Sequence, residues 1–203
     1  MLKIFNSQLS ILIFITIFLL FYNIAIAKSP SEFIDEISNE ASEILSSNET
    51  NNIKISKLIK IGEEAVDIKG LAFYTLGKHR KTLNEEQKNE YKNIFYEYFL
   101  KSFSNRLVEY RDAKIVVISE DVKNEKYTIV KSKLLATDKR PEISIDWRVY
   151  TKNPDKPLIR DLIIEGLSLA RTQKEEFNSI ILNNNGDVNA LLINLKEFNK
   201  SKN

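Results

Sequence analysis

The spacing of the apolar residues changes twice along this chain, and this limits the fold more than any other feature. From residue 33 to about 110 they recur every three or four residues, which is typical of amphipathic helices. Between 114 and 169 they alternate with polar residues, as in strands with one buried face. From about 172 the helical spacing returns. This order of helices, strands and helices predicts an α+β fold.

The alternating part predicts four strands in one sheet. In the third strand, Ile143, Ile145 and Trp147 fall on one face. The connecting segments 121–125, 137–141 and 151–157 are short, and short connections join antiparallel neighbours. The predicted strands are 114–119, 126–136, 142–150 and 158–169.

Helix ends are marked by capping residues. Gly77, followed by basic residues 78–81, is a typical helix stop, and Asp187 is a helix N-cap. The predicted helices run over about 30–45, 53–65, 67–76, 84–110, 172–186 and 187–198. Three pairs have the spacing of a capping box: Ser29 with Glu32, Asn84 with Gln87, and Thr172 with Glu175.

The first 27 residues have the layout of a secretion signal. Lys3 precedes an apolar run from Leu9 to Tyr22, and residues 25–27 read Ala-Ile-Ala, the small-residue pattern of a cleavage site. The alternative is an uncleaved anchor, because the run approaches the ~20 residues that span a bilayer. We expect cleavage, which leaves 28–203 as a single domain.

Composition excludes several classes of function. The chain has no cysteine, so disulfides, thiolate catalysis and cysteine-bound metals are excluded. Its net charge of +2 argues against nucleic acid as the main partner. The glycines form no nucleotide-binding motif, and His79 is the only histidine. We interpret His79 as part of a basic helix end, and we expect no metal and no cofactor.

The segment RDLIIEGLSLARTQKEEF, residues 160–177, changes from strand to helix within a few residues. Asp161 and Glu165 are four apart, so they share a strand face with Ile163 and Leu167. Two acids on one face can act as an acid/base pair, but they also occur in structural networks. We favour the structural role.

The helix at 84–110 is unusually aromatic. Its apolar side chains cover a wider arc than the ~100° stripe of an ordinary amphipathic helix. It therefore packs on two sides or lines a cavity, and the residues alone leave both open. These side chains are Tyr91, Ile94, Phe95, Tyr98, Phe99, Phe103 and Leu107.

Several segments, in order, resemble the MlaC family of periplasmic phospholipid-transport components, also called toluene-tolerance proteins. Residues 161–169 resemble its signature of an aspartate, aliphatics, Glu-Gly, an aliphatic and Ser, followed by a charged helix. Leu76-Gly77-Lys78, the helix start at 82–87 and the helix end at 100–110 resemble further family segments. Leu167 and Phe103 depart from the valine and tyrosine that are commoner there.

The resemblance implies a periplasmic phospholipid carrier, not an enzyme, with a curved four-stranded sheet and helices around an apolar pocket. Such a protein holds acyl tails and shuttles lipid between an outer-membrane lipoprotein–porin complex and an inner-membrane ABC complex, which maintains outer-membrane lipid asymmetry. We expect a monomer. The residues that we expect to contact lipid are Phe95, Phe99, Phe103, Leu107, Ile143, Ile145, Trp147, Ile163 and Leu167.

Two other classes of function remain open at this level. A curved sheet around an apolar pocket can host a dehydratase or isomerase that uses a buried carboxylate. Asp161 is the candidate for that carboxylate. A ligand-free adaptor that touches envelope complexes would instead have a solid core. Bound phospholipid in the purified protein discriminates the carrier from both.

Overall fold

The computed structural model describes residues 28–110 and 112–201, so the predicted signal segment and its cleavage site lie outside the described residues. The α+β order predicted from the sequence is confirmed. Within these residues, no helix has the length and apolar character needed to cross a membrane. The helices are α2 (Pro30–Ser46), α3 (Asn51–Ala65), α4 (Ile68–Leu76), the 3₁₀ helix η1 (Gly77–Lys81), α5 (Glu85–Leu107), α6 (Leu169–Asn183) and α7 (Val188–Lys200).

The sheet has five antiparallel strands in sequence order, one more than predicted. The extra strand arises because the fourth predicted strand breaks at Glu165-Gly166 and returns as a short hairpin. The first strand also extends further than predicted and carries two register shifts. The strands are β1 (Ile115–Asn124), β2 (Tyr127–Leu134), β3 (Ile143–Tyr150), β4 (Leu158–Ile164) and β5 (Leu167–Ser168).

Two of the three predicted capping boxes are confirmed. The side chains of Ser29 and Asn84 each accept a hydrogen bond from the backbone N–H three residues on. The side chains of Glu32 and Gln87 in turn accept a hydrogen bond from the backbone N–H of the cap residue. The third pair was wrong: α6 begins at Leu169, and its N-cap is Ser168 instead of Thr172. Ser168 caps the helix because Asp161 holds its side chain in place, and this partner cannot be recognised from local spacing.

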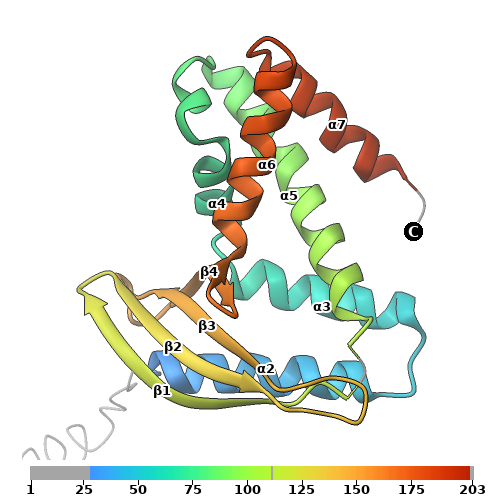
Figure 1. The fold of residues 1–203 in the computed structure, drawn as a ribbon, viewed down its shortest axis with the longest axis vertical. Coiled ribbons are helices and arrows are strands. Elements are labelled where there is room, and N and C mark those ends of the chain that lie inside the picture. The colour runs from blue at the N-terminus through green and yellow to red at the C-terminus, as the bar shows by residue number, and fades with distance from the viewer. Residues whose placement is uncertain (1–27, 111, 202–203) are drawn as a thin grey trace, which may run out of the picture.

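The helices divide between the sheet and a bundle (Figure 1). α2 lies along β1 and β2, while α4, α5, α6 and α7 rise away from the sheet. α5 spans both regions: it packs on α4 and α7 and, at its lower end, on α3. One hydrophobic core joins the two regions, since Ile34 of α2, Trp147 of β3 and Phe95 of α5 belong to the same buried cluster.

Gly77 joins α4 to η1 in a backbone conformation that other residues rarely adopt. Its φ is 57° and its ψ is −129°. The predicted helix stop is therefore confirmed, although the chain continues at once as a 3₁₀ turn that carries the basic residues 78–81. A Cβ at this position would also lie 2.9 Å from Cε of Lys174.

We expect Gly77→Ala to lower the free energy of unfolding by about 2 kcal/mol, because a side chain is strained in this conformation. Gly166→Ala is the matched control: its φ is +82°, but no atom lies within 4 Å of the added Cβ. The control should cost only about 1 kcal/mol. Urea unfolding measures both, and equal losses would contradict the larger strain that we expect at Gly77.

Candidate functional site

Four aromatic rings form a column along one side of α5. Tyr91, Phe95, Phe99 and Phe103 are spaced four residues apart, so each ring lies one turn below the last. The centroids of successive rings are 5.8, 6.2 and 5.7 Å apart. Tyr91 and Phe95 are buried, whereas Phe99 and Phe103 are partly exposed. The column therefore passes from a closed core at its upper end to an accessible apolar surface at its lower end.

The upper end of the column is closed by α4, α6 and α7. The rings of Phe177, on α6, and Phe95 pack in a T-shaped arrangement with their centroids 6.2 Å apart. Tyr98 packs on both Phe177 and Phe198. The hydroxyl of the fully buried Tyr91 lies 2.9 Å from Thr75 Oγ1. Burial raises the pKa of Tyr91 far above its ordinary value, so this hydroxyl stays neutral at any physiological pH.

The side chains at the lower end of the column are partly exposed. Phe99 and Phe103 stack with an angle of 9° between their planes. Gly62 of α3 allows α5 to approach closely, since a Cβ there would lie 3.1 Å from Leu100 and 3.5 Å from Phe103. Leu107, at the end of α5, is half-buried against the core. Three of the predicted residues, Phe99, Phe103 and Leu107, are thus placed together where the core becomes accessible.

The predicted residues of β3 lie on the core face of the sheet. Ile145 and Trp147 are buried and Ile143 is partly buried against the same core. Trp147 Nε1 donates to Ser132 Oγ at 2.8 Å, and this hydroxyl donates to the carbonyl of Ile145 at 3.0 Å. The N–H of the indole, its one polar group, is therefore hydrogen-bonded, and the rest of the ring is an apolar surface.

The register of β3 and β4 corrects one expectation. Ile163 pairs with Asp146, whereas Leu162 pairs with Trp147. Because directly paired residues share a face, Ile163 lies on the side of the sheet away from Trp147, and Leu162 takes the expected place. Leu167 begins the β5 hairpin and is 60% exposed. Leu167 pairs with Ile164, which pairs with Ile145, so Leu167 lies on the face of Trp147 and not on that of Ile163. The expectation that Ile163 and Leu167 share one strand face was therefore wrong, and their contact with lipid stays a prediction.

Asp161 is a structural carboxylate with three partners. It is 4% exposed and accepts hydrogen bonds from Ser168 Oγ at 2.6 Å and from the backbone N–H of Ala170 at 3.0 Å. Arg148 Nη1 lies 3.6 Å from the same carboxylate. The buried charge thus fixes the first turn of α6 onto β4. This arrangement supports the structural role of Asp161.

Glu165 and Gly166 form the tight turn that ends β4. Their φ angles are 49° and 82°, the two positive values of a type I′ hairpin turn. The carboxylate of Glu165 accepts a hydrogen bond from the backbone N–H of Ser144, and its own N–H donates to the carbonyl of Ser144. Glu165 therefore holds the turn against β3, and it is not paired with Asp161 as a catalytic dyad would be.

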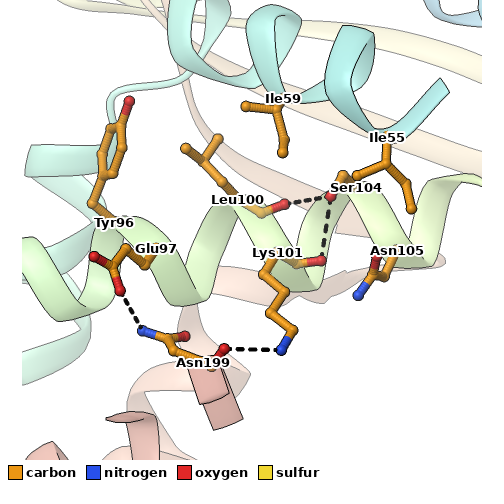
Figure 2. A pocket seen from close by; sticks show the side chains of 9 residues that line it. All are labelled: Ile55, Ile59, Tyr96, Glu97, Leu100, Lys101, Ser104, Asn105 and Asn199. Atoms are coloured by element: carbon orange, nitrogen blue, oxygen red, sulfur yellow. Dashed lines mark hydrogen bonds between the residues drawn. The ribbon is translucent and has the colours of Figure 1, made fainter. Parts of the chain in front are cut away.

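A groove between α3, α5 and α7 was not predicted from the sequence. Its volume is about 340 Å³. Ile55, Ile59 and Leu100 form an apolar wall, while Lys101 and Asn199 lie on the polar side (Figure 2). Lys101 Nζ donates to the carbonyl of Phe198 at 2.9 Å, at the C-terminal end of α7. In the sequence, the only sign of this groove is the four-residue spacing of Ile55 and Ile59.

A second unpredicted feature joins the sheet to α4. Arg160 Nε lies 2.6 Å from the carboxylate of Asp67, and its Nη1 donates to the hydroxyl of Tyr127 at 2.6 Å. The guanidinium also lies 3.6 Å from the centroid of the Tyr150 ring. The same Asp67 caps α4 through the N–H of Gly70. This cluster therefore fixes the start of α4 relative to the sheet.

The residues described contain no cluster of three or more His, Cys, Asp or Glu side chains that could hold a metal ion. His79 Nε2 lies 2.9 Å from Asn178 Oδ1, which ties η1 to α6. What the chain brings together instead is apolar: a stacked aromatic pair at the accessible end of a core shared by helices and sheet. Such a surface can hold an alkyl chain away from water.

Comparisons with known proteins identify the fold and the family. A solved phospholipid-binding protein from Ralstonia solanacearum, in complex with a phospholipid, has a similar fold with a TM-score of 0.70. The two chains are 17% identical, and the match covers 85% of this chain and 97% of that one. No curated protein sequence matches. The profile of the MlaC protein family matches residues 33–197, most of the chain, and the chain therefore belongs to this family.

Proposed function

We propose that this chain is a periplasmic phospholipid carrier. The observation that carries the proposal is the accessible stacked pair Phe99 and Phe103, in a fold shared with a phospholipid-bound protein. A phospholipid has two long acyl tails, and each methylene that leaves water contributes about 0.8 kcal/mol. Exposing both tails costs more than about 20 kcal/mol, so free lipid does not cross an aqueous compartment at a useful rate.

The tails would lie against the lower half of the aromatic column and the core face of β3. Phe99, Phe103 and Leu107 supply the accessible side, and Ile143 supplies the partly buried edge of the sheet. Phe95, Ile145 and Trp147 are buried members of the core to which Phe99 and Ile143 pack. Binding of this kind needs no nucleophile, no general base and no metal. The transported phospholipid is the only ligand that we propose, and the chain acts as a binding protein instead of an enzyme.

The carrier would exchange lipid with two membrane complexes. Membership of the MlaC family supports an outer-membrane lipoprotein–porin complex at one side and an inner-membrane ABC complex at the other, with ATP used by the latter. In this role the chain leaves its signal segment behind, works as a monomer in the periplasm and maintains the lipid asymmetry of the outer membrane.

Lipid extraction and native mass spectrometry of the exported protein test the proposal. We expect co-purified phospholipid, and its amount should fall at least tenfold in Phe103→Glu, because a buried carboxylate beside acyl tails is unfavourable. Ile55→Glu is the matched control: it places the same charge in the groove of Figure 2, which Ile55 lines and Phe103 does not. The control should keep its lipid.

Leu167→Glu examines the hairpin separately. Because Leu167 is exposed, the substitution should change the free energy of unfolding by less than about 0.5 kcal/mol. We expect it to reduce the bound lipid all the same, and retained lipid would remove Leu167 from the site. If the wild-type protein carries no lipid and takes none up from vesicles, the carrier proposal itself is wrong.

A further inference from the structure

A basic surface lies at the end of the molecule away from the sheet, where η1 lies between α4 and α5 (Figure 1). Lys78, Arg80 and Lys81 are exposed on this 3₁₀ turn. Lys174 of α6 packs over the turn, with Cε 2.9 Å from the position of a Cβ on Gly77. We name these four cations the basic end. The bond between His79 and Asn178 holds η1 on α6, so the cluster is fixed in place.

The cations of the basic end have no ion-pair partner in the part of the chain that the structure describes. Among the ion pairs of the described residues, none includes Lys78, Arg80, Lys81 or Lys174. Glu85, at the start of α5, is already paired with Lys88 at 2.8 Å. The four cations thus form a local excess of positive charge, although the whole chain is nearly neutral.

Apolar side chains are exposed beside these cations. Tyr74 is 40% exposed, and Lys174 Nζ lies 5.2 Å from the centre of its ring. Leu182 is 53% exposed and lies one helical turn beyond Asn178, on the face of α6 that meets η1. Cations next to an exposed aromatic ring and a leucine are typical of surfaces that lie at a membrane interface.

We propose that the basic end docks on an anionic phospholipid bilayer. The cations meet the phosphate groups, while Tyr74 and Leu182 enter the interfacial layer. An acidic protein surface would also attract the charge, but leucine is under-represented among the residues that dominate protein–protein binding. Docking is a separate property from holding acyl tails, because the basic end is on η1 and α6 and the proposed tail site is on lower α5 and β3.

Vesicle co-sedimentation of the exported chain tests the docking. The vesicles contain equal parts of phosphatidylcholine and phosphatidylglycerol, and phosphatidylcholine vesicles are the reference. The variant combines Lys78→Gln, Arg80→Gln and Lys81→Gln. The matched control combines Lys139→Gln, Lys152→Gln and Lys156→Gln, which removes the same charge from exposed positions in the loops of the sheet. Urea unfolding shows that both variants remain folded.

We expect binding to the anionic vesicles alone, and its loss at about 1 M salt, where the Debye length is about 3 Å. The variant at the basic end should bind roughly 100-fold more weakly, because each basic residue at an anionic surface is worth about a factor of five. The control variant should lose much less of its affinity for the anionic vesicles. Leu182→Gln, which leaves the charge unchanged, should weaken binding several-fold.

Equal binding of the two triple variants, or no binding to anionic vesicles, overturns the docking proposal. If the substitutions at the basic end abolish binding to an acidic envelope protein but leave binding to vesicles unchanged, the partner is that protein and not the bilayer. Lipid extraction from the same variants keeps the two proposals apart. Loss of vesicle binding with full lipid content supports docking, whereas empty protein in every variant contradicts the carrier proposal.

Discussion

Asp161→Ala is expected to lower the free energy of unfolding by about 3 kcal/mol. The carboxylate is buried and accepts from Ser168 Oγ and from the N–H of Ala170, and hydrogen bonds to a charged group contribute about 1.5–3 kcal/mol each. Its loss also leaves Arg148 without its carboxylate. Urea unfolding followed by circular dichroism measures the change.

Asp146→Ala is the control for this prediction. Asp146 lies on β3, beside the β4 residue Ile163, and is only partly buried. Its removal should cost less than about 0.5 kcal/mol. Hydrogen exchange adds a second readout, since the amides of Ala170 and Arg171 should lose protection in Asp161→Ala alone. A cost below 1 kcal/mol, with protected amides, would contradict the role of Asp161 as the anchor of α6.

Phe95→Ala is expected to have the largest effect on stability, about 4 kcal/mol, because truncating a buried phenylalanine leaves a cavity and costs about 3–5 kcal/mol. Phe95 is 2% exposed and contacts the rings of Tyr91, Tyr98, Phe99 and Phe177. The column would therefore lose its central ring. Urea unfolding of the lipid-free protein gives the value.

Phe103→Ala makes the same chemical change at the accessible end of the column. Phe103 contacts Phe99 on one side and is partly exposed, so its truncation should cost under about 2 kcal/mol. The amount of bound lipid should show the opposite order. Phe103→Ala should lose more lipid than Phe95→Leu, a variant that we expect to remain folded. The reverse order in both measurements would place the tail site at the upper end of the column.

The residues by themselves determined most of the helices and strands of this fold and several of their ends. Helix caps and stops depend on contacts within a few residues, so Ser29, Asn84 and Gly77 could be recognised from spacing. The alternation of β3 likewise gave the correct buried face for Ile145 and Trp147. The aromatic spacing of α5 predicted that the helix packs on two sides or lines a cavity, and its contacts with α3, α4 and α7 show packing on more than one side.

Only the tertiary structure decided which of these residues meet. The face of Ile163 depends on its register with β3, and a shift of one residue exchanges the two faces of a strand. Ser168 became the N-cap of α6 because Asp161, seven residues earlier, holds it. The groove of Figure 2 and the bond from Arg160 to Asp67, 93 residues apart, join elements whose proximity no local pattern records. Spacing reports interactions between neighbours in sequence, whereas accessibility depends on the packing of all elements together.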